Sequence, residues 1–238
     1  GRIPQVIEEL KTKLSELKKE RDKYERETSD YIKFDELQAR YKELLNSLYG
    51  VLLYPNFRLF SPTVAETITK VGREVTKTIK RIFEKMGYDV CYGDTDSTFV
   101  IIPQKNHQEI YEILDVVNET LRKYFDRKYG IKSTFNLEYE KHLKRIVITE
   151  AKKKYVGIVD FMDGKETDFI YAKGFDIIRK TTPEYFKDKL KEITRILLKK
   201  KDVDKIIKIT KKMFEEIQQK TPYEISLSLT ISKNIKDY

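Results

Sequence analysis

Two aspartates separated by a single residue stand between two apolar runs of the chain. They belong to the stretch Cys91-Tyr92-Gly93-Asp94-Thr95-Asp96-Ser97, and β-branched and aromatic residues flank it on both sides. Such flanks favour strands and Gly93-Asp94 favours a tight turn, so we expect a β-hairpin with both aspartates at its tip. Two carboxylates so close repel each other unless a cation neutralises them. Their oxygens suit Mg²⁺, whereas the plainer alternative is a solvated turn, because turns favour Asp for local reasons.

A second group of polar side chains recurs along one predicted helix, from about Phe34 to Tyr49, which we expect to end at Gly50. Its apolar stripe consists of Leu37, Tyr41, Leu44 and Leu48. Another face carries Gln38, Lys42, Asn46 and Tyr49, which share one side of a helix by their spacing. Such a face can pair with a phosphate, donate hydrogen bonds and pack on a base. The alternative for a surface lysine such as Lys42 is simple solvation.

The composition bounds the kind of protein and its partners. The chain has 238 residues, of which 39% are hydrophobic and 37% charged, with a net charge of +9. That length and apolar content predict a globular core in one or two domains, and the charge predicts an anionic partner. A lysine- and glutamate-rich thermophile surface is the alternative. The one cysteine excludes internal disulfides, and no apolar run predicts a membrane span. Because the chain begins with Gly1, we expect a fragment, a processed product or a tagged protein.

Periodicity predicts the elements that position these residues. We expect helices over residues 3–31, 34–49, 61–86 and 108–128, and a pair over 183–220 split near Lys201-Asp202. The apolar residues of the first helix form a narrow coiled-coil-like seam that Arg21 interrupts. The third helix begins with a capping box of Thr63 and Glu66. Gly87 and Gly130 end the third and fourth helices. Besides the aspartate hairpin, we expect strands over 135–139, 145–149 and 155–161, the last turning at Met162-Asp163-Gly164. Helices and strands without strict alternation predict an α+β fold.

Two motifs of this chain resemble those of the B-family (alpha-like) DNA polymerases of archaeal type. Tyr-Gly-Asp-Thr-Asp-Ser at residues 92–97 is similar to the third polymerase motif of the family. Lys42 to Gly50 fits the family's Lys-x-x-x-Asn-Ser-x-Tyr-Gly at the usual distance upstream. The resemblance extends over essentially the whole chain. It implies an antiparallel palm sheet backed by helices over residues 51–180, helical-hairpin fingers over 1–50, and the inner part of a thumb over 181–238.

The resemblance also implies a nucleotide site. Lys42 is expected to contact the incoming triphosphate, and Asn46 and Tyr49 to shape the pocket of the nascent base pair. The family's first fingers helix usually adds an Arg and a Lys, whose positions fall here on Leu14 and Lys18. Lys18 is therefore expected to bind the nucleotide, and Lys13 can replace the missing Arg.

The DNA-contacting residues implied by the resemblance lie in three places. Lys152-Lys153-Lys154-Tyr155 resembles the family's Lys-Lys-x-Tyr element, which grips the primer–template duplex. Its lysines would neutralise phosphates without reading sequence, although a lysine run is often only a solvated loop. A segment near the primer supplies Gly174, Arg179 and Lys180, and there Thr181 replaces an Asp of the family, so an ion pair expected at that point is lost. Thr95, between the aspartates, completes the set.

The implied activity is template-directed nucleotidyl transfer on deoxynucleoside triphosphates with two Mg²⁺ ions. Asp96 is the first choice of bridging ligand and Asp94 the second, with Glu140 expected near the metals. The family's first motif, Asp-x-x-Ser-Leu-Tyr-Pro-Ser, which carries a further carboxylate, does not occur here. We therefore expect either a second polypeptide to supply the N-terminal, exonuclease and first-motif part, or this chain to be an excised piece of a longer enzyme that contains it. In both cases the isolated chain is expected to be inactive. Residues 231–238 resemble a segment after which the family chain continues into the outer thumb. The expected location is cytoplasmic and associated with the nucleoid.

Two alternatives of other classes remain. A non-catalytic nucleic-acid-binding accessory subunit derived from a polymerase would explain the basic charge and the missing motif, but such a module does not need paired acids at a hairpin tip. A structural coiled coil explains residues 3–31 alone.

Overall fold

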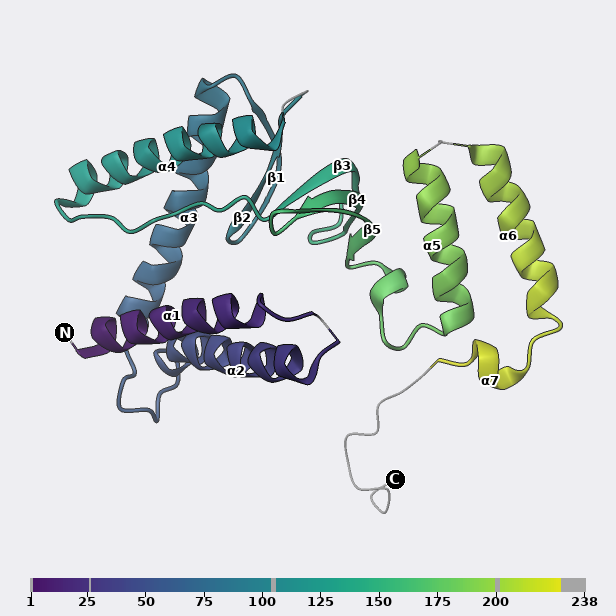
Figure 1. Ribbon diagram of the computed structural model, residues 1–238, viewed down its shortest axis with the longest axis horizontal. Coiled ribbons are helices and arrows are strands. Elements are labelled where there is room, and N and C mark those ends of the chain that lie inside the picture. The colour runs from purple at the N-terminus through teal and green to yellow at the C-terminus, as the bar shows by residue number, and fades with distance from the viewer. Residues whose placement is uncertain (1, 26, 104–105, 200–201, 228–238) are drawn as a thin grey trace, which may run out of the picture. The chain divides into compact units, whose positions relative to one another are not determined.

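The structure of the chain is a computed structural model that describes residues 2–25, 27–103, 106–199 and 202–227 (Figure 1). It divides into two compact units, residues 1–100 and 101–238. The described strands form a two-stranded sheet, β1-β2, and a three-stranded sheet, β3-β4-β5. This mixture of helices and small sheets is the α+β class predicted from the sequence. The division into fingers, palm and thumb stays a prediction, and the expectation for residues 231–238 lies outside the described residues.

An antiparallel helical hairpin begins the first unit, as predicted, but its break comes earlier than the sequence suggested (Figure 1). Helix α1 spans Arg2–Arg21 and helix α2 spans Ser29–Val51. Thr28 caps α2 because its hydroxyl accepts a hydrogen bond from the backbone N–H of Tyr31 at 3.3 Å. The prediction of one helix over residues 3–31 was therefore wrong at its C-terminal end.

Arg21 continues the seam between these helices instead of interrupting it. Its guanidinium donates to Asp35 at 3.0 Å and to Gln38 at 2.8 Å, both on α2. This contact turns Gln38 toward α1, so Gln38 does not share the exposed face of Lys42. Leu44, placed in the apolar stripe by spacing, is 50% exposed, and Leu45 is the more buried neighbour. The predicted stripe was therefore wrong at that position.

Helix α3, Pro62–Lys85, and the hairpin of β1, Asp89–Asp94, and β2, Ser97–Ile101, follow an irregular segment. The N-cap of α3 is Ser61 and Thr63 lies inside the helix, so the predicted capping box was wrong. The C-terminal prediction is confirmed. Gly87 has a φ of 84°, and the N–H groups of Gly87 and Tyr88 donate to the carbonyls of Glu84 and Phe83. These two bonds form a Schellman motif, which turns the chain into β1.

Helix α4, His107–Tyr129, begins the second unit and is followed by an extended segment that joins no sheet. Residues 133–140 alternate half-buried and exposed, which is the pattern that predicted a strand over 135–139. The pairing partner is a helix side chain instead. Asn118, 4% exposed, accepts from the N–H of Leu137 at 2.6 Å and donates to its carbonyl at 2.9 Å. One amide thus replaces two ladder hydrogen bonds, so the strand prediction was wrong although the alternation was real.

The three-stranded antiparallel sheet is the core of the second unit. It consists of β3, Lys141–Ile148, β4, Tyr155–Met162, and β5, Lys165–Lys173. β4 and β5 turn at Asp163 and Gly164, which have φ values of 50° and 78°, so the predicted turn is confirmed. The sequence analysis did not anticipate β5. Val156 and Ile158 of the central strand are buried with Leu198 of α5, Glu184–Lys199, in one hydrophobic cluster.

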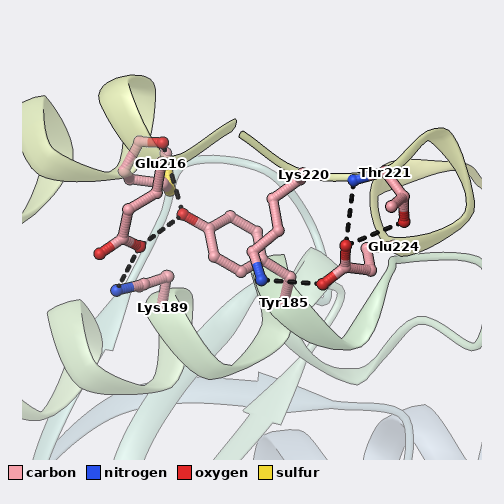
Figure 2. A network of polar contacts seen from close by, with 7 residues as sticks. Tyr185, Lys189, Glu216, Lys220, Thr221 and Glu224 are labelled. Carbon is pink, nitrogen blue, oxygen red and sulfur yellow. Dashed lines mark hydrogen bonds and ion pairs between the residues drawn. The ribbon is translucent and has the colours of Figure 1, made fainter. Parts of the chain in front are cut away.

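The predicted pair of C-terminal helices is confirmed as α5 and α6, Val203–Ile217, and a short helix α7, Pro222–Ile225, adds to it. Figure 2 shows two sets of polar contacts in this group, one between α5 and α6 and one at the start of α7. The Tyr185 hydroxyl of α5 donates to Glu216 of α6 at 2.9 Å, and Lys189 pairs with the same carboxylate at 3.0 Å. Lys220 pairs with Glu224 of α7 at 2.8 Å. Within the described ranges no helix is both long and apolar enough to cross a membrane.

Candidate active site and nucleic-acid interface

The two aspartates lie at the tip of the β1-β2 hairpin, as predicted, but the turn itself is one step further along the chain. Asp94 ends β1, and Thr95 and Asp96 form the loop before Ser97. The backbone N–H of Asp96 donates to the carbonyl of Asp94 at 2.6 Å, which closes a γ-turn around Thr95. Gly93 is a strand residue, so the prediction of a Gly93-Asp94 turn was wrong.

Thr95 has a φ of 51°, which is unusual for a β-branched residue. Strained backbone of this kind persists only where surrounding contacts hold it. Three are present: the Ser97 hydroxyl donates to the carbonyl of Asp94 at 3.1 Å, the Thr95 hydroxyl donates to the Asp94 carboxylate at 3.2 Å, and the Thr76 hydroxyl lies 3.1 Å from the carbonyl of Thr95. The tip is therefore a defined turn and not a loose loop.

Thr76 connects the turn to helix α3, and the sequence analysis missed it. Its hydroxyl lies 3.1 Å from the carbonyls of both Gly72, one helical turn earlier, and Thr95. Sequence offers no signal for this contact, because a helical Thr usually bonds to its own helix. Cross-strand contact of Tyr92 with Phe99, whose rings lie 5.6 Å apart, also holds the hairpin. Helix and strands together fix the direction of the acidic tip.

The donor set at this tip suits Mg²⁺ in kind, since both side chains offer carboxylate oxygens. Asp94 is half-buried and Asp96 is exposed. Among the described residues, however, no group of three or more His, Cys, Asp or Glu side chains is arranged to hold a metal ion. Asp94 and Asp96 can therefore contribute ligands to a magnesium site, and further ligands must come from outside the described residues or from water. Glu140 pairs with Lys141 at 2.7 Å.

The residues expected to meet the nucleotide are on the hairpin of α1 and α2. Lys42, Asn46 and Tyr49 are all exposed along α2, and Lys18 is exposed on α1. Lys13, the candidate replacement for an Arg, pairs with Glu16 at 3.0 Å. Leu14, at the position of that Arg, is half-buried in the seam of the hairpin. The exposed trio on α2 forms an accessible polar face at successive helical turns.

Two sequence-distant elements of the expected DNA interface meet in the structure. The backbone of Lys153 and Lys154 lies against Gly174, where an added Cβ would be 2.5 Å from the Lys153 carbonyl oxygen. Lys153 and Gly174 both have positive φ values, 60° and 71°. The Lys154 ammonium lies 5.2 Å from the centre of the Phe175 ring. The structure thus places the lysine turn directly beside the Gly174 segment. Lys152 and Lys153 are exposed and Lys154 is half-buried.

Tyr155 differs from the other expected DNA contacts because it is only 3% exposed. Its backbone pairs with Lys173 of β5, and its ring stacks on Tyr171 at 6.0 Å. A side chain so covered supports the turn from beneath and does not present its ring to a duplex in this structure.

Arg179 and Lys180 follow a short 3-10 helix, η1, Asp176–Ile178, and both are exposed. Arg179 pairs with Asp176 at 2.9 Å. Because both groups are largely exposed, the pair contributes little stability and leaves Arg179 accessible to a phosphate.

The family of the chain follows from comparison with known proteins. The model of DNA polymerase family B matches residues 1–238. DNA polymerase 2 of Aeropyrum pernix is 29% identical over 92% of this chain, and the DNA polymerase of Thermococcus gorgonarius is 30% identical over 100% of it. The chain belongs to DNA polymerase family B, and these relatives are archaeal.

A solved structure supports the same assignment at the level of the fold. The family B DNA polymerase of Pyrobaculum calidifontis covers the whole chain with a TM-score of 0.54 and 26% sequence identity. The chain spans only 28% of that polymerase, and 25% and 29% of the Aeropyrum and Thermococcus relatives. The match is thus to about a quarter of a polymerase.

Proposed function

We propose that this chain is part of a DNA-directed DNA polymerase and contributes part of its active site. The observation that carries the proposal is the pair Asp94 and Asp96 on a well-held hairpin turn, in a chain that matches the family B model over its length. A binding module gains nothing from two repelling carboxylates at an exposed tip. The substrates are primer–template DNA and deoxynucleoside triphosphates.

The chain's own residues have separate parts in this reaction. Asp94 and Asp96 would hold two Mg²⁺ ions together with a carboxylate from the family's first motif. When bound, the ions would activate the primer hydroxyl and stabilise the charge of the transition state. Lys42 pairs with the triphosphate, while Asn46, Tyr49 and Lys18 orient the nucleotide. Lys152 to Lys154, Arg179 and Lys180 neutralise backbone phosphates, and Thr95 and Gly174 allow the duplex to approach.

We propose that the enzyme is completed by a part that carries the Asp-x-x-Ser-Leu-Tyr-Pro-Ser motif with the N-terminal and exonuclease parts. This part lies either on a second polypeptide or in a longer form of this chain, and a separate polypeptide that contains it is called the first-motif polypeptide. Two observations support the proposal: the first motif does not occur in residues 1–238, and the hairpin tip offers two carboxylates one residue apart. A two-metal site would need a carboxylate besides this pair, and the first motif would supply it. Because DNA is its proposed substrate, we propose that the enzyme lies in the cytoplasm in association with the nucleoid.

Substitution of one aspartate in the completed enzyme tests the proposal. Asp96→Ala, assayed by single-nucleotide incorporation with the first-motif polypeptide and Mg²⁺, should lower the rate at least ~10³-fold, because ligand loss removes charge stabilisation from the transition state. Asp89→Ala is the matched control, since Asp89 is an exposed acid at the start of the same strand. DNA affinity should change little in either variant. A wild-type rate for Asp96→Ala would leave the chain as an accessory DNA-binding subunit.

A further inference from the structure

A series of stacked rings and lysines lies beneath the expected DNA-binding turn. Tyr155, which follows the lysines directly, stacks on Tyr171 with ring centres 6.0 Å apart and planes 30° from parallel. The Lys173 ammonium lies 5.9 Å from the Tyr155 ring. Tyr155 is thus enclosed by two β5 residues, which fixes its ring and the backbone that leads into the turn.

Lys141, the first residue of β3, holds the other end of this series. Its ammonium lies 4.0 Å from the centre of the Tyr171 ring, which is the shortest cation–ring distance among the described residues. Its side chain is only 11% exposed and pairs with Glu140 at 2.7 Å. A lysine so covered and paired is poorly placed to meet a phosphate, so its positive charge acts on the ring.

Direct contacts also hold the turn, which lies against Gly174 and, through Lys154, against the Phe175 ring. The carbonyl of Lys154 accepts from the backbone N–H and from the hydroxyl of Thr149, both at 3.0 Å. Lys153 has a positive φ of 60°, a conformation that costs free energy for a residue with a side chain. A turn with such backbone strain keeps its shape only if its surroundings constrain it. The aromatic support beneath Lys154 and Tyr155 contributes to that constraint.

We propose that Tyr171 and Lys141 are positioning residues for DNA binding. They lock Tyr155, and through it they hold Lys152 to Lys154 in the geometry that places their ammonium groups on successive phosphates of the duplex. This inference rests on the proposed function, because it assumes that the lysine turn contacts DNA. It adds two residues that need no contact with the nucleic acid and that none of the expected motifs contains.

Salt dependence of DNA binding separates positioning from plain stability. Each phosphate contact contributes about 0.9 to the slope of log affinity against log salt concentration. Tyr171→Leu removes the ring without changing the charge of the protein. If the ring positions the turn, this variant should reduce the slope of log affinity against log salt concentration for primer–template DNA by about 0.9, the value of one phosphate contact. Tyr171→Phe, which keeps a ring, should restore the wild-type slope. A ring that serves only stability would lower the unfolding midpoint and leave the slope unchanged.

The controls make the outcomes distinguishable. Phe169→Leu replaces another β5 ring two residues away and should leave the slope at the wild-type value. Lys141→Met, with Lys141→Arg as its rescue, repeats the test should Tyr171→Leu fail to fold. The triple variant Lys152→Ala, Lys153→Ala, Lys154→Ala measures the contribution of the turn itself. An unchanged slope in Tyr171→Leu beside a lowered slope in the triple variant would overturn the inference alone. An unchanged slope in the triple variant would overturn the DNA-binding role of the turn, and the inference with it.

Discussion

At the scale of single residues, Lys42 carries the clearest prediction about the nucleotide. Its exposed ammonium on α2 is proposed to pair with the triphosphate, and such a charge-assisted contact strengthens as charge develops in the transition state. Lys42→Ala in the completed enzyme should therefore raise KM for the nucleotide and lower kcat, with a combined loss of about 10- to 100-fold in kcat/KM.

Steady-state incorporation kinetics check this, with Lys33→Ala as the matched control because Lys33 is another exposed lysine of α2. The control should behave as wild type. Wild-type kcat and KM for Lys42→Ala would show that this lysine is only a solvated surface residue.

Gly174 allows a second residue-scale prediction, because its backbone and its neighbours forbid a side chain for two different reasons. Its φ is 71°, and a Cβ would be 2.5 Å from the Lys153 carbonyl oxygen. Gly164, with a φ of 78°, has open space at the same point. Gly164→Ala should cost about 1–2 kcal/mol for the left-handed conformation, whereas Gly174→Ala should cost about 2–5 kcal/mol because backbone atoms must also move.

Urea denaturation of the two variants measures the difference, and the DNA affinity of Gly174→Ala should fall with it because the lysine turn is displaced. Equal stability losses in the two glycine variants would mean that the Lys153 backbone yields freely.

At the scale of elements, the α5–α6–α7 group predicts a measurable acid titration. Lys220, together with the N–H and hydroxyl of Thr221, lowers the pKa of Glu224 to about 2 from the usual 4.5. Lys189 and the Tyr185 hydroxyl also lower the pKa of Glu216. A carboxyl group whose pKa is lowered in the folded state stabilises that state at pH values above its ordinary pKa. The stabilisation from Glu224 should therefore be lost as the pH falls from about 4.5 to about 2.

Carboxyl chemical shifts followed by NMR give the Glu224 midpoint directly. Lys220→Met should move it upward, whereas Lys211→Met, on the exposed side of α6, should leave it in place. A wild-type midpoint near 4.5 would contradict the network in Figure 2.

The sequence predicted most elements but misplaced the contacts that need a partner far along the chain. Helical periodicity located α3 to α6, because a buried stripe depends on local spacing alone. The alternation over residues 133–140 could not reveal that Asn118 supplies the hydrogen bonds of a missing strand. Likewise, the turn was predicted at Gly93-Asp94 because that pair is typical of hairpin turns. The observed turn is at Thr95, where the Thr76 side chain of α3 contacts the Thr95 carbonyl. Burial of Tyr155 also depends on β5, which the sequence analysis missed.

At the scale of the whole molecule, the chain matches about a quarter of its polymerase relatives and has a net charge of +9. Its proposed site residues are of three kinds: acids on a hairpin, a polar helix face, and a supported lysine turn. The sequence predicted them through resemblance to the family motifs, because such motifs preserve residue types at short spacings. It could not show the support beneath them, since Thr76, Lys141 and Tyr171 lie outside any motif.

The central claim is that this chain supplies one part of a divided active site. Primer extension with Mg²⁺ tests it most directly, comparing the highly purified chain, the first-motif polypeptide and an equimolar mixture of the two. The account predicts extension by the mixture and none by either polypeptide alone, because two adjacent carboxylates hold Mg²⁺ poorly without a ligand from a second strand. Robust extension by this chain alone, at the rate of the mixture, would contradict it.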